Sequence, residues 1–237
     1  MLTFKPISSS SSGNAYIVSD GETEILLECG VRFREIQQAT GFKTSSLAGC
    51  LLTHEHKDHS LAIKEVLRSG INVYTSKGTA DALGIQHHRI KTIESRKQFK
   101  LGTFTILPFD VEHDVSEPLG FLIQSKNGEK LLFATDTYYI RYRFKGINII
   151  AVECNFSEKI LDENIIRGEV PAVLKNRLLR SHFSFENYKE FLKANDLSSV
   201  REIWLIHMSD TNSDEELFKK EIRELTGKPV YVAGGSI

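Results

Sequence analysis

The chain has 237 residues, of which 41% are apolar and 26% charged, values that are ordinary for a soluble globular protein. Its 30 Lys and Arg against 31 Asp and Glu give a net charge of −1, so bulk charge does not mark a nucleic-acid binder. The three cysteines (Cys29, Cys50 and Cys154) lie far apart, which excludes a zinc finger and favours a reducing compartment. Because no signal-peptide core or membrane-length apolar run is found, we expect a cytoplasmic protein without membrane contact.

The apolar pattern predicts mainly strands in the first half of the chain. In chain order we expect strands at 2–7, 15–18 and 24–27, a helix at 32–40, a buried strand at 50–53, a helix at 61–68, a short helix capped at 75–76 and ending at 83, and strands at 99–101, 104–107 and 120–123 within a β-rich stretch from 91 to 133. Residues 8–14, mostly serine, are expected to form a loop that presents backbone N–H groups and hydroxyls to a site.

The second half changes to strand–helix alternation. The expected elements are strands at 148–152, 203–206 and 230–232, and helices at 171–179, 184–194 and 214–225. This order predicts two sheets packed together with helices outside. We therefore expect a mixed α/β (α+β) protein in which one four-layer domain spans residues 1–237.

The most informative motif is H-x-H-x-D-H at residues 54–59, directly after the strand expected at 50–53. Imidazole nitrogens and carboxylate oxygens are ligands that zinc and related divalent cations prefer. His54 and His56 share one face of an extended segment, while Asp58 and His59 follow where the chain turns. This clustering favours two adjacent metals over one. The helical zinc-protease motif H-E-x-x-H is excluded, because position 58 is not histidine.

Three further candidate ligands, His113, Asp136 and His207, each follow an apolar run that reads as a strand. Ligands at the carboxyl ends of core strands can converge on one rim of a sheet. With the motif at 54–59 they complete two coordination spheres, so we expect two divalent ions per chain. Zinc is the first expectation and manganese the alternative.

His182 lies just before an expected helix start, a position suited to meeting an anion. We expect it to contact substrate or to act as a catalytic proton donor, and a histidine that only caps the helix is the alternative. Glu153 and Asn155 follow the strand at 148–152. They are expected to orient a ligand imidazole, and Asn155 is also a candidate substrate-binding residue.

Because it carries the H-x-H-x-D-H motif, the chain resembles the metallo-β-lactamase superfamily, and in particular its YycJ/WalJ-like branch. The resemblance extends over nearly the whole chain and implies the αββα sandwich, in agreement with the four layers expected above. Its further marks are Ser11-Ser12-Gly13-Asn14, His113-Asp114, Glu117-Pro118-Leu119-Gly120-Phe121, Ala134-Thr135-Asp136-Thr137, Glu153-Cys154-Asn155, Ser181-His182-Phe183-Ser184 and His207-Met208-Ser209-Asp210-Thr211-Asn212.

The resemblance also implies how the ligands are divided between the two metals, and it shows where this chain departs from its relatives. Glu28 stands where the family usually has Asp, and its added methylene would shift a hydrogen bond behind the ligands. Phe156 stands where relatives often carry His, which bears on substrate choice. By the resemblance, one metal is held by His54, His56 and His113, the second by Asp58, His59 and His207, and Asp136 bridges them.

Hydrolysis of a phosphodiester is the reaction that the resemblance implies. Two adjacent divalent ions lower the pKa of a bridging water and neutralise a phosphoryl oxygen. Asp58 would steer the attacking group, and His182 would protonate the leaving oxygen. A nuclease acting on DNA or RNA is the first expectation.

Other functions remain open. A phosphodiesterase for a small cyclic or signalling nucleotide is the alternative, which the near-neutral charge and the absence of a long insertion favour. A catalytically silent metal-binding module is disfavoured, since all seven ligand positions are filled. Small enzymes of this fold often pair, so a homodimer is also open.

Overall fold

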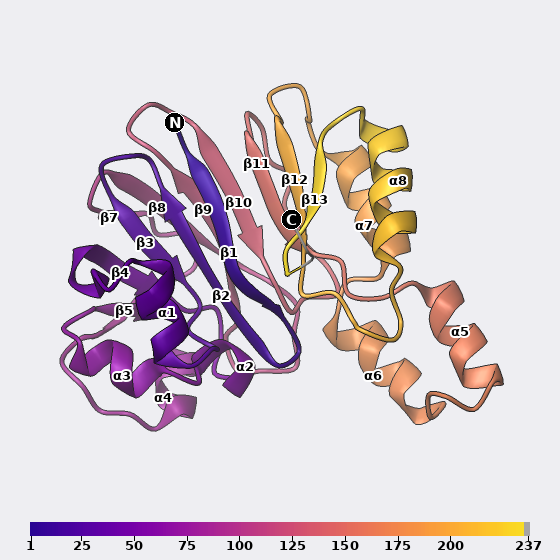
Figure 1. Ribbon diagram of the computed structural model, residues 1–237, viewed down its shortest axis with the longest axis horizontal. Coiled ribbons are helices and arrows are strands. Elements are labelled where there is room, and N and C mark those ends of the chain that lie inside the picture. The colour runs from indigo at the N-terminus through magenta and orange to yellow at the C-terminus, as the bar shows by residue number, and fades with distance from the viewer. Residues whose placement is uncertain (235–237) are drawn as a thin grey trace.

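The first sheet of the computed structural model, which describes residues 1–234, has six strands side by side in chain order (Figure 1). They are β1 (Thr3–Ser10), β2 (Gly13–Ser19), β3 (Glu24–Leu27), β4 (Leu47–Leu51), β5 (Val73–Thr75) and β6 (Ile90–Thr92). The first three strands pair antiparallel, whereas β3 to β6 run parallel. Parallel neighbours need crossover connections. These contain α1 (Phe33–Ala39), the 3₁₀ turn η1 (Thr44–Ser46), α2 (Lys57–Ser60), α3 (Ile63–Arg68) and α4 (Lys77–Leu83).

The second sheet has seven strands in the order β13-β12-β11-β10-β9-β8-β7 within the described residues. The strands are β7 (Phe99–Leu101), β8 (Phe104–Asp110), β9 (Leu119–Gln124), β10 (Lys130–Ala134), β11 (Ile149–Glu153), β12 (Glu202–Ile206) and β13 (Val230–Val232). β7 to β10 form an antiparallel meander, and β10 to β13 are parallel. The later crossovers contain α5 (Glu158–Ile166), α6 (Val173–Ser181), α7 (Phe185–Ala194) and α8 (Glu215–Thr226).

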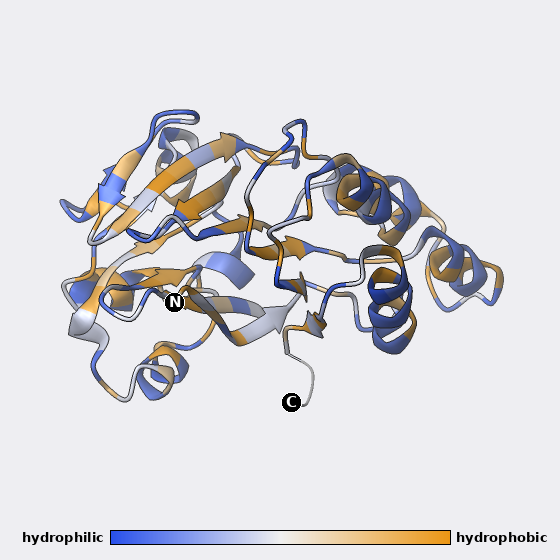
Figure 2. Cartoon of the chain, turned by 90° about the horizontal axis from the view of Figure 1, so that it is seen from above, coloured by the Kyte–Doolittle hydropathy of each residue, from blue (hydrophilic) through white to orange (hydrophobic). Residues whose placement is uncertain are grey.

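Alternating apolar side chains explain why the two sheets stack with helices outside. Along β2, Tyr16 and Val18 join a core that both sheets share, whereas Ala15 and Ile17 join a second core with α1 and α3. The outer face of the second sheet packs in the same way on α7 and α8. Figure 2 shows the apolar strands in the interior and hydrophilic helix surfaces at the periphery. The expected four-layer αββα arrangement is confirmed.

Local expectations were wrong at several places, among them the absence of a strand where β5 lies. The loop expected at 8–14 is a tight hairpin, because β1 continues to Ser10 and β2 begins at Gly13. Residues 57–60 form the short helix α2 rather than a loop. Helix α5 was not expected, because only Leu161 and Asn164 on it are buried, which leaves a weak apolar stripe. Across residues 1–234, no helix combines the length and apolarity that crossing a membrane requires.

Candidate metal centre

The candidate metal centre lies at the rim where β4, β8, β10 and β12 end. The structure brings all seven predicted ligands to this rim, in two groups that share Asp136. Within each group the ligand atoms lie within 4.8 Å of one another. The first group is His54, His56, His113 and Asp136, and the second is Asp58, His59, Asp136 and His207.

A close backbone approach places α2 and its two ligands at this rim. Cys29 N–H donates to the His59 carbonyl at 2.8 Å, and Ala62 N–H donates to the Cys29 carbonyl at 2.8 Å. A Cβ added at Gly30 would lie 1.6 Å from the Asp58 carbonyl oxygen. Position 30 therefore has to be glycine for the chain after β3 to pass against α2.

The backbone is strained where two of the ligands leave their strands. Asp136 has a φ of 46° and His207 a φ of 52°, in the left-handed region that residues other than glycine seldom adopt. Glu28, behind the site, also has a positive φ of 61°. Strain of this kind persists where surrounding contacts enforce it and is concentrated at functional sites.

The first group combines three imidazoles with one carboxylate oxygen. His113 Nε2 lies 3.3 Å from His56 Nδ1 and 3.8 Å from Asp136 Oδ2. His54 Nδ1 lies 2.9 Å from Thr53 Oγ1, whereas its buried Nε2 has no hydrogen-bond partner among residues 1–234 and lies 3.7 Å from Asp136 Oδ2. Burial lowers the pKa of His54 well below its usual value and keeps the ring neutral, the form that binds metal.

The second group is more strongly anionic. His59 Nε2 lies 3.1 Å from Asp58 Oδ2 and 3.2 Å from Asp136 Oδ1, and His207 Nε2 lies 3.4 Å from Asp58 Oδ2. Burial acts to lower the pKa of His207, but Asp136 and the other carboxylates outweigh it and raise the pKa to about 10. The same carboxylates would attract a metal cation, which would displace the imidazole protons. Both groups therefore fit divalent cations in ligand type and spacing.

The first hairpin supports the second group from behind. The Asn14 Nδ2 amide donates to Asp58 Oδ2 at 3.3 Å, and the Ser9 hydroxyl accepts from the His207 backbone N–H at 2.8 Å. Residues 8–14 were expected to turn polar groups toward a site. In the structure, Ser9 near the end of β1 and Asn14 near the start of β2 turn polar groups toward the site. Only the alternation of side chains along these two strands could have identified these two residues.

Glu153 connects one candidate ligand with His182. Its Oε1 lies 2.8 Å from His207 Nδ1 and 2.6 Å from His182 Nδ1, and its Oε2 accepts from Thr137 N–H at 3.0 Å. The ring of His182 stacks on that of His207 with centroids 5.5 Å apart. Burial acts to lower the pKa of His182, but the Glu153 carboxylate outweighs it and the pKa is raised. His182 therefore lies beside the second group in a position that favours its protonated form.

Asn155, Glu28 and Phe156 lie behind the ligands. Asn155 is buried and its amide donates to the His207 carbonyl at 2.7 Å, so its contacts fit the positioning of His207, and its role in substrate binding stays a prediction. The Glu28 carboxylate accepts from Thr53 N–H at 3.2 Å and lies 3.5 Å from His59 Nδ1, so its longer side chain still reaches a ligand. Phe156 packs in a small apolar cluster beneath α5 and α6.

The chain is similar in sequence and in fold to several known proteins. Residues 23–208 match the β-lactamase superfamily domain. The exodeoxyribonuclease YycJ of Bacillus anthracis is 26% identical over 251 residues, which cover 98% of this chain and 92% of YycJ. The exodeoxyribonuclease WalJ of Streptococcus pneumoniae serotype 2 is 28% identical over 228 residues, 89% of this chain and 83% of WalJ.

A solved structure shows the same fold. The metallo-β-lactamase fold protein YhfI of Bacillus subtilis superposes with a TM-score of 0.77 at 14% identity and covers 100% of this chain and 98% of YhfI. At this identity the likeness concerns the fold alone. Together with the match over residues 23–208, it confirms the resemblance drawn from the 54–59 motif. The chain belongs to the β-lactamase superfamily, as a metal-dependent hydrolase similar to the YycJ/WalJ branch.

Proposed function

We propose that the chain is a phosphodiesterase that uses two divalent metal ions and cleaves nucleic acid, with DNA as the first substrate to test. The observation that carries the proposal is the pair of ligand groups that share the Asp136 carboxylate. Two metals held this close suit a reaction in which both the attacking and the leaving oxygen of a phosphate need charge stabilisation. The names of the relatives YycJ and WalJ, both exodeoxyribonucleases, support a nucleic-acid substrate.

Zinc is the first metal to test, because five of the seven ligands in the two groups are imidazoles. Manganese is the second, since the remaining two are carboxylates. When bound, the ions would supply a water of lowered pKa and neutralise charge on the phosphoryl oxygens.

We assign the two proton-handling positions to Asp58 and His182. The Asp58 side chain is 24% exposed against 4% for Asp136, so it is the carboxylate that an attacking group at the open side can reach. His182 is 17% exposed and is held by Glu153, which raises its pKa against the effect of burial. A protonated imidazole in this position can donate to the leaving oxygen.

The alternative, a phosphodiesterase for a small cyclic nucleotide, is favoured by the net charge of −1. It uses the same metal chemistry and differs only in what binds outside the metal centre. Comparing turnover of a 5′-labelled oligonucleotide with that of a cyclic mononucleotide distinguishes the two.

The test of the proposed function is hydrolysis of a bis-aryl phosphodiester by the purified chain with zinc or manganese, beside a count of bound metal. We expect two metals per chain and turnover that chelation abolishes. Asp58→Asn keeps the size of the side chain but removes its charge, and should reduce turnover by at least about 100-fold. Asp81→Asn, on the surface helix α4, is the matched control and should act like the unchanged chain. A chain without bound metal would refute the proposal.

A further inference from the structure

A segment of alternating aromatic and basic residues leads away from the metal centre. It runs from Tyr139 to Lys145 between β10 and β11 and begins three residues after Asp136. Burial alternates along it: Ile140 and Phe144 are buried and Tyr142 is half-buried, whereas the positions between them are exposed. The exposed positions are Tyr139, Arg141, Arg143 and Lys145. The segment thus presents one aromatic ring followed by three cations.

Fixed contacts hold this segment against the protein. The Tyr142 hydroxyl donates to Asp110 Oδ2 at 2.9 Å, and Phe144 N–H donates to Asn195 Oδ1 at 2.7 Å. At its start, the Thr137 hydroxyl donates to the Tyr139 carbonyl at 2.8 Å. The outward side chains therefore project from an anchored backbone.

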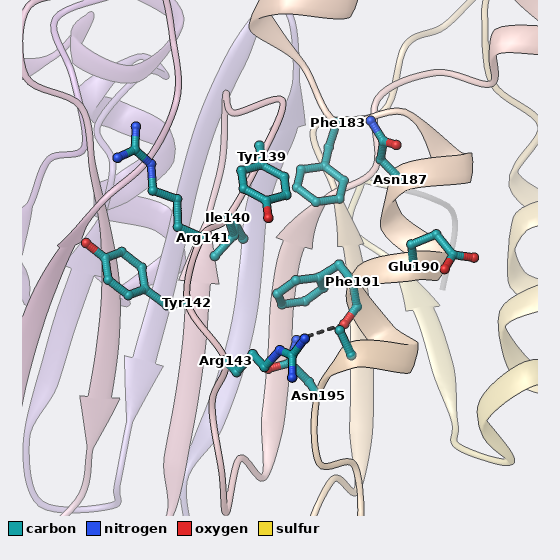
Figure 3. A pocket seen from close by; sticks show the side chains of 11 residues that line it. Tyr139, Ile140, Arg141, Tyr142, Arg143, Phe183, Asn187, Glu190, Phe191 and Asn195 are labelled. Carbon is teal, nitrogen blue, oxygen red and sulfur yellow. Dashed lines mark hydrogen bonds between the residues drawn. The ribbon is translucent and has the colours of Figure 1, made fainter.

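The segment and α7 enclose a pocket next to the candidate centre. The pocket has a volume of about 290 Å³, at the lower limit of small-molecule sites, which suits a single base rather than a duplex. Figure 3 shows Tyr139 and Phe183 side by side at one end, and Arg143 and Asn195 at the other. Phe183 directly follows His182, so the aromatic end of the pocket adjoins the metal centre and the basic end lies farther away.

Three charged side chains line the pocket: Arg141, Arg143 and Glu190. Glu190 pairs with Lys193, so the excess charge is positive and favours an anionic chain. Tyr139 is 55% exposed, so the face of its ring is free to stack on a base. Arg141 pairs with Glu112, whereas no described residue forms an ion pair with Arg143. A cyclic mononucleotide has one phosphate, which the metal centre would take, and would leave this cation unused. A polynucleotide strand offers a further phosphate beyond each base.

We propose that the Tyr139–Arg143 segment and α7 form a subsite for single-stranded nucleic acid, in which Tyr139 stacks on a base and Arg143 binds a backbone phosphate. The inference rests on the proposed nuclease function and gives its substrate class. Stacking requires a base whose faces are free, so the subsite selects an unpaired strand or a frayed end over a blunt duplex. Binding of this kind depends little on base sequence and strongly on salt.

The test is the affinity of the full chain for a fluorescent single-stranded oligothymidylate. It is measured by fluorescence anisotropy in the presence of a chelator, so that no cleavage occurs. Tyr139→Leu should weaken binding by about 5- to 150-fold, the loss expected for one base stack. Tyr139→Phe keeps the ring and should bind like the unchanged chain, which separates stacking from a folding defect. Arg143→Gln should reduce the slope of log affinity against log salt by about 0.7. Arg34→Gln, an exposed position on α1, should leave the slope unchanged.

The outcomes separate this proposal from the proposed function. If the unchanged chain hydrolyses the bis-aryl diester but Tyr139→Leu and Arg143→Gln bind the oligonucleotide normally, the subsite is refuted and the function stands. If these variants instead lose only the binding of a cyclic mononucleotide, the pocket is a mononucleotide site and the proposal is overturned. If oligonucleotide binding falls as expected in a chain that hydrolyses no phosphodiester, the subsite stands and the function fails.

Discussion

The Glu153 carboxylate contacts two histidines at once, and Glu153→Gln tests what both contacts do. Oε1 lies 2.6 Å from His182 Nδ1 and 2.8 Å from His207 Nδ1, while Oε2 accepts backbone N–H groups from Thr137 and Phe183 at 3.0 and 3.3 Å. A glutamine side chain keeps one acceptor oxygen but replaces the other by an NH₂ donor. We expect the loss of one charge-assisted hydrogen bond, about 1.5–3 kcal/mol. This corresponds to roughly 10- to 150-fold in affinity or rate.

Two assays show how much of that loss comes from the contact with His207 and how much from the contact with His182. Zinc affinity, measured by competition with a chromogenic chelator, should fall by about 10- to 100-fold, because His207 loses the partner that orients its ring. Turnover at saturating zinc should then be compared between a 4-nitrophenyl diester and an alkyl diester. If His182 protonates the leaving oxygen, the variant should lose more rate with the alkyl ester, since 4-nitrophenolate leaves without a proton.

A matched control is Glu186→Gln, which changes a nearby half-buried carboxylate that accepts from the Ser157 hydroxyl and Glu158 N–H. It should change neither zinc affinity nor the leaving-group dependence. His182→Asn should reproduce the leaving-group effect and leave zinc affinity nearly unchanged. Equal rate losses with both esters and unchanged zinc affinity for Glu153→Gln would refute the assigned role of Glu153.

Three further outcomes are expected. Glu28→Gln removes the charge beside His59 Nδ1 and should weaken zinc binding by about 10-fold in the competition assay, and unchanged affinity would contradict that contact. Phe121→Ala, fully buried between the sheets, should reduce the free energy of unfolding in urea by about 3–5 kcal/mol. Burial acts to raise the pKa of Asp20, but hydrogen bonds from Thr103 and Thr23 outweigh it and the pKa is lowered. Asp20→Asn should therefore cost about 1–2 kcal/mol at pH 7. That difference should persist above the ordinary pKa of about 3.9 and vanish as the pH falls through the lowered one, and a pH-independent difference in urea denaturation would be inconsistent with this origin.

The positions of the candidate ligands could be predicted to lie together, because local sequence shows that each follows a strand. His54 and His56 are two residues apart after an apolar run, and Asp136 and His207 each follow another such run. The end of a strand, and the residues that follow it, can be located from the pattern of apolar residues alone. Parallel strands then bring their carboxyl ends to one rim of the sheet. The four-layer fold was predictable for the same reason, since each strand's two apolar faces require a partner on both sides.

That Glu153 and Asn155 orient a ligand imidazole could be expected from their place after a strand. Which residues they contact could not be predicted, because these contacts join residues that are distant in sequence. Glu153 meets His182 across 29 positions and His207 across 54, and Asn14 meets Asp58 across 44. No periodicity encodes which carboxylate will meet which imidazole. The Tyr139 pocket was missed for a related reason: the basic residues at 141–145 are ordinary in sequence, and only their alternation with buried neighbours and the approach of α7 make them a surface.

The charges gathered at the rim also bear on the proposal of two divalent ions, since they suit two ions better than one. Glu28 and Glu153 are fully buried, Asp136 is 3% exposed, and Asp58 lies beside them. Four carboxylates this close and this buried repel one another, and burying them without positive partners is costly. Protonated His182 balances Glu153, which leaves three negative charges. One divalent cation would leave one of these three unbalanced, whereas two would balance them all. The imidazoles of the ligand groups can then remain neutral, as ligation by nitrogen requires. The carboxylates behind the ligands thus set the charge of the site as well as its geometry, which is why Glu28 and Glu153 belong to its chemistry although neither is in the predicted ligand set.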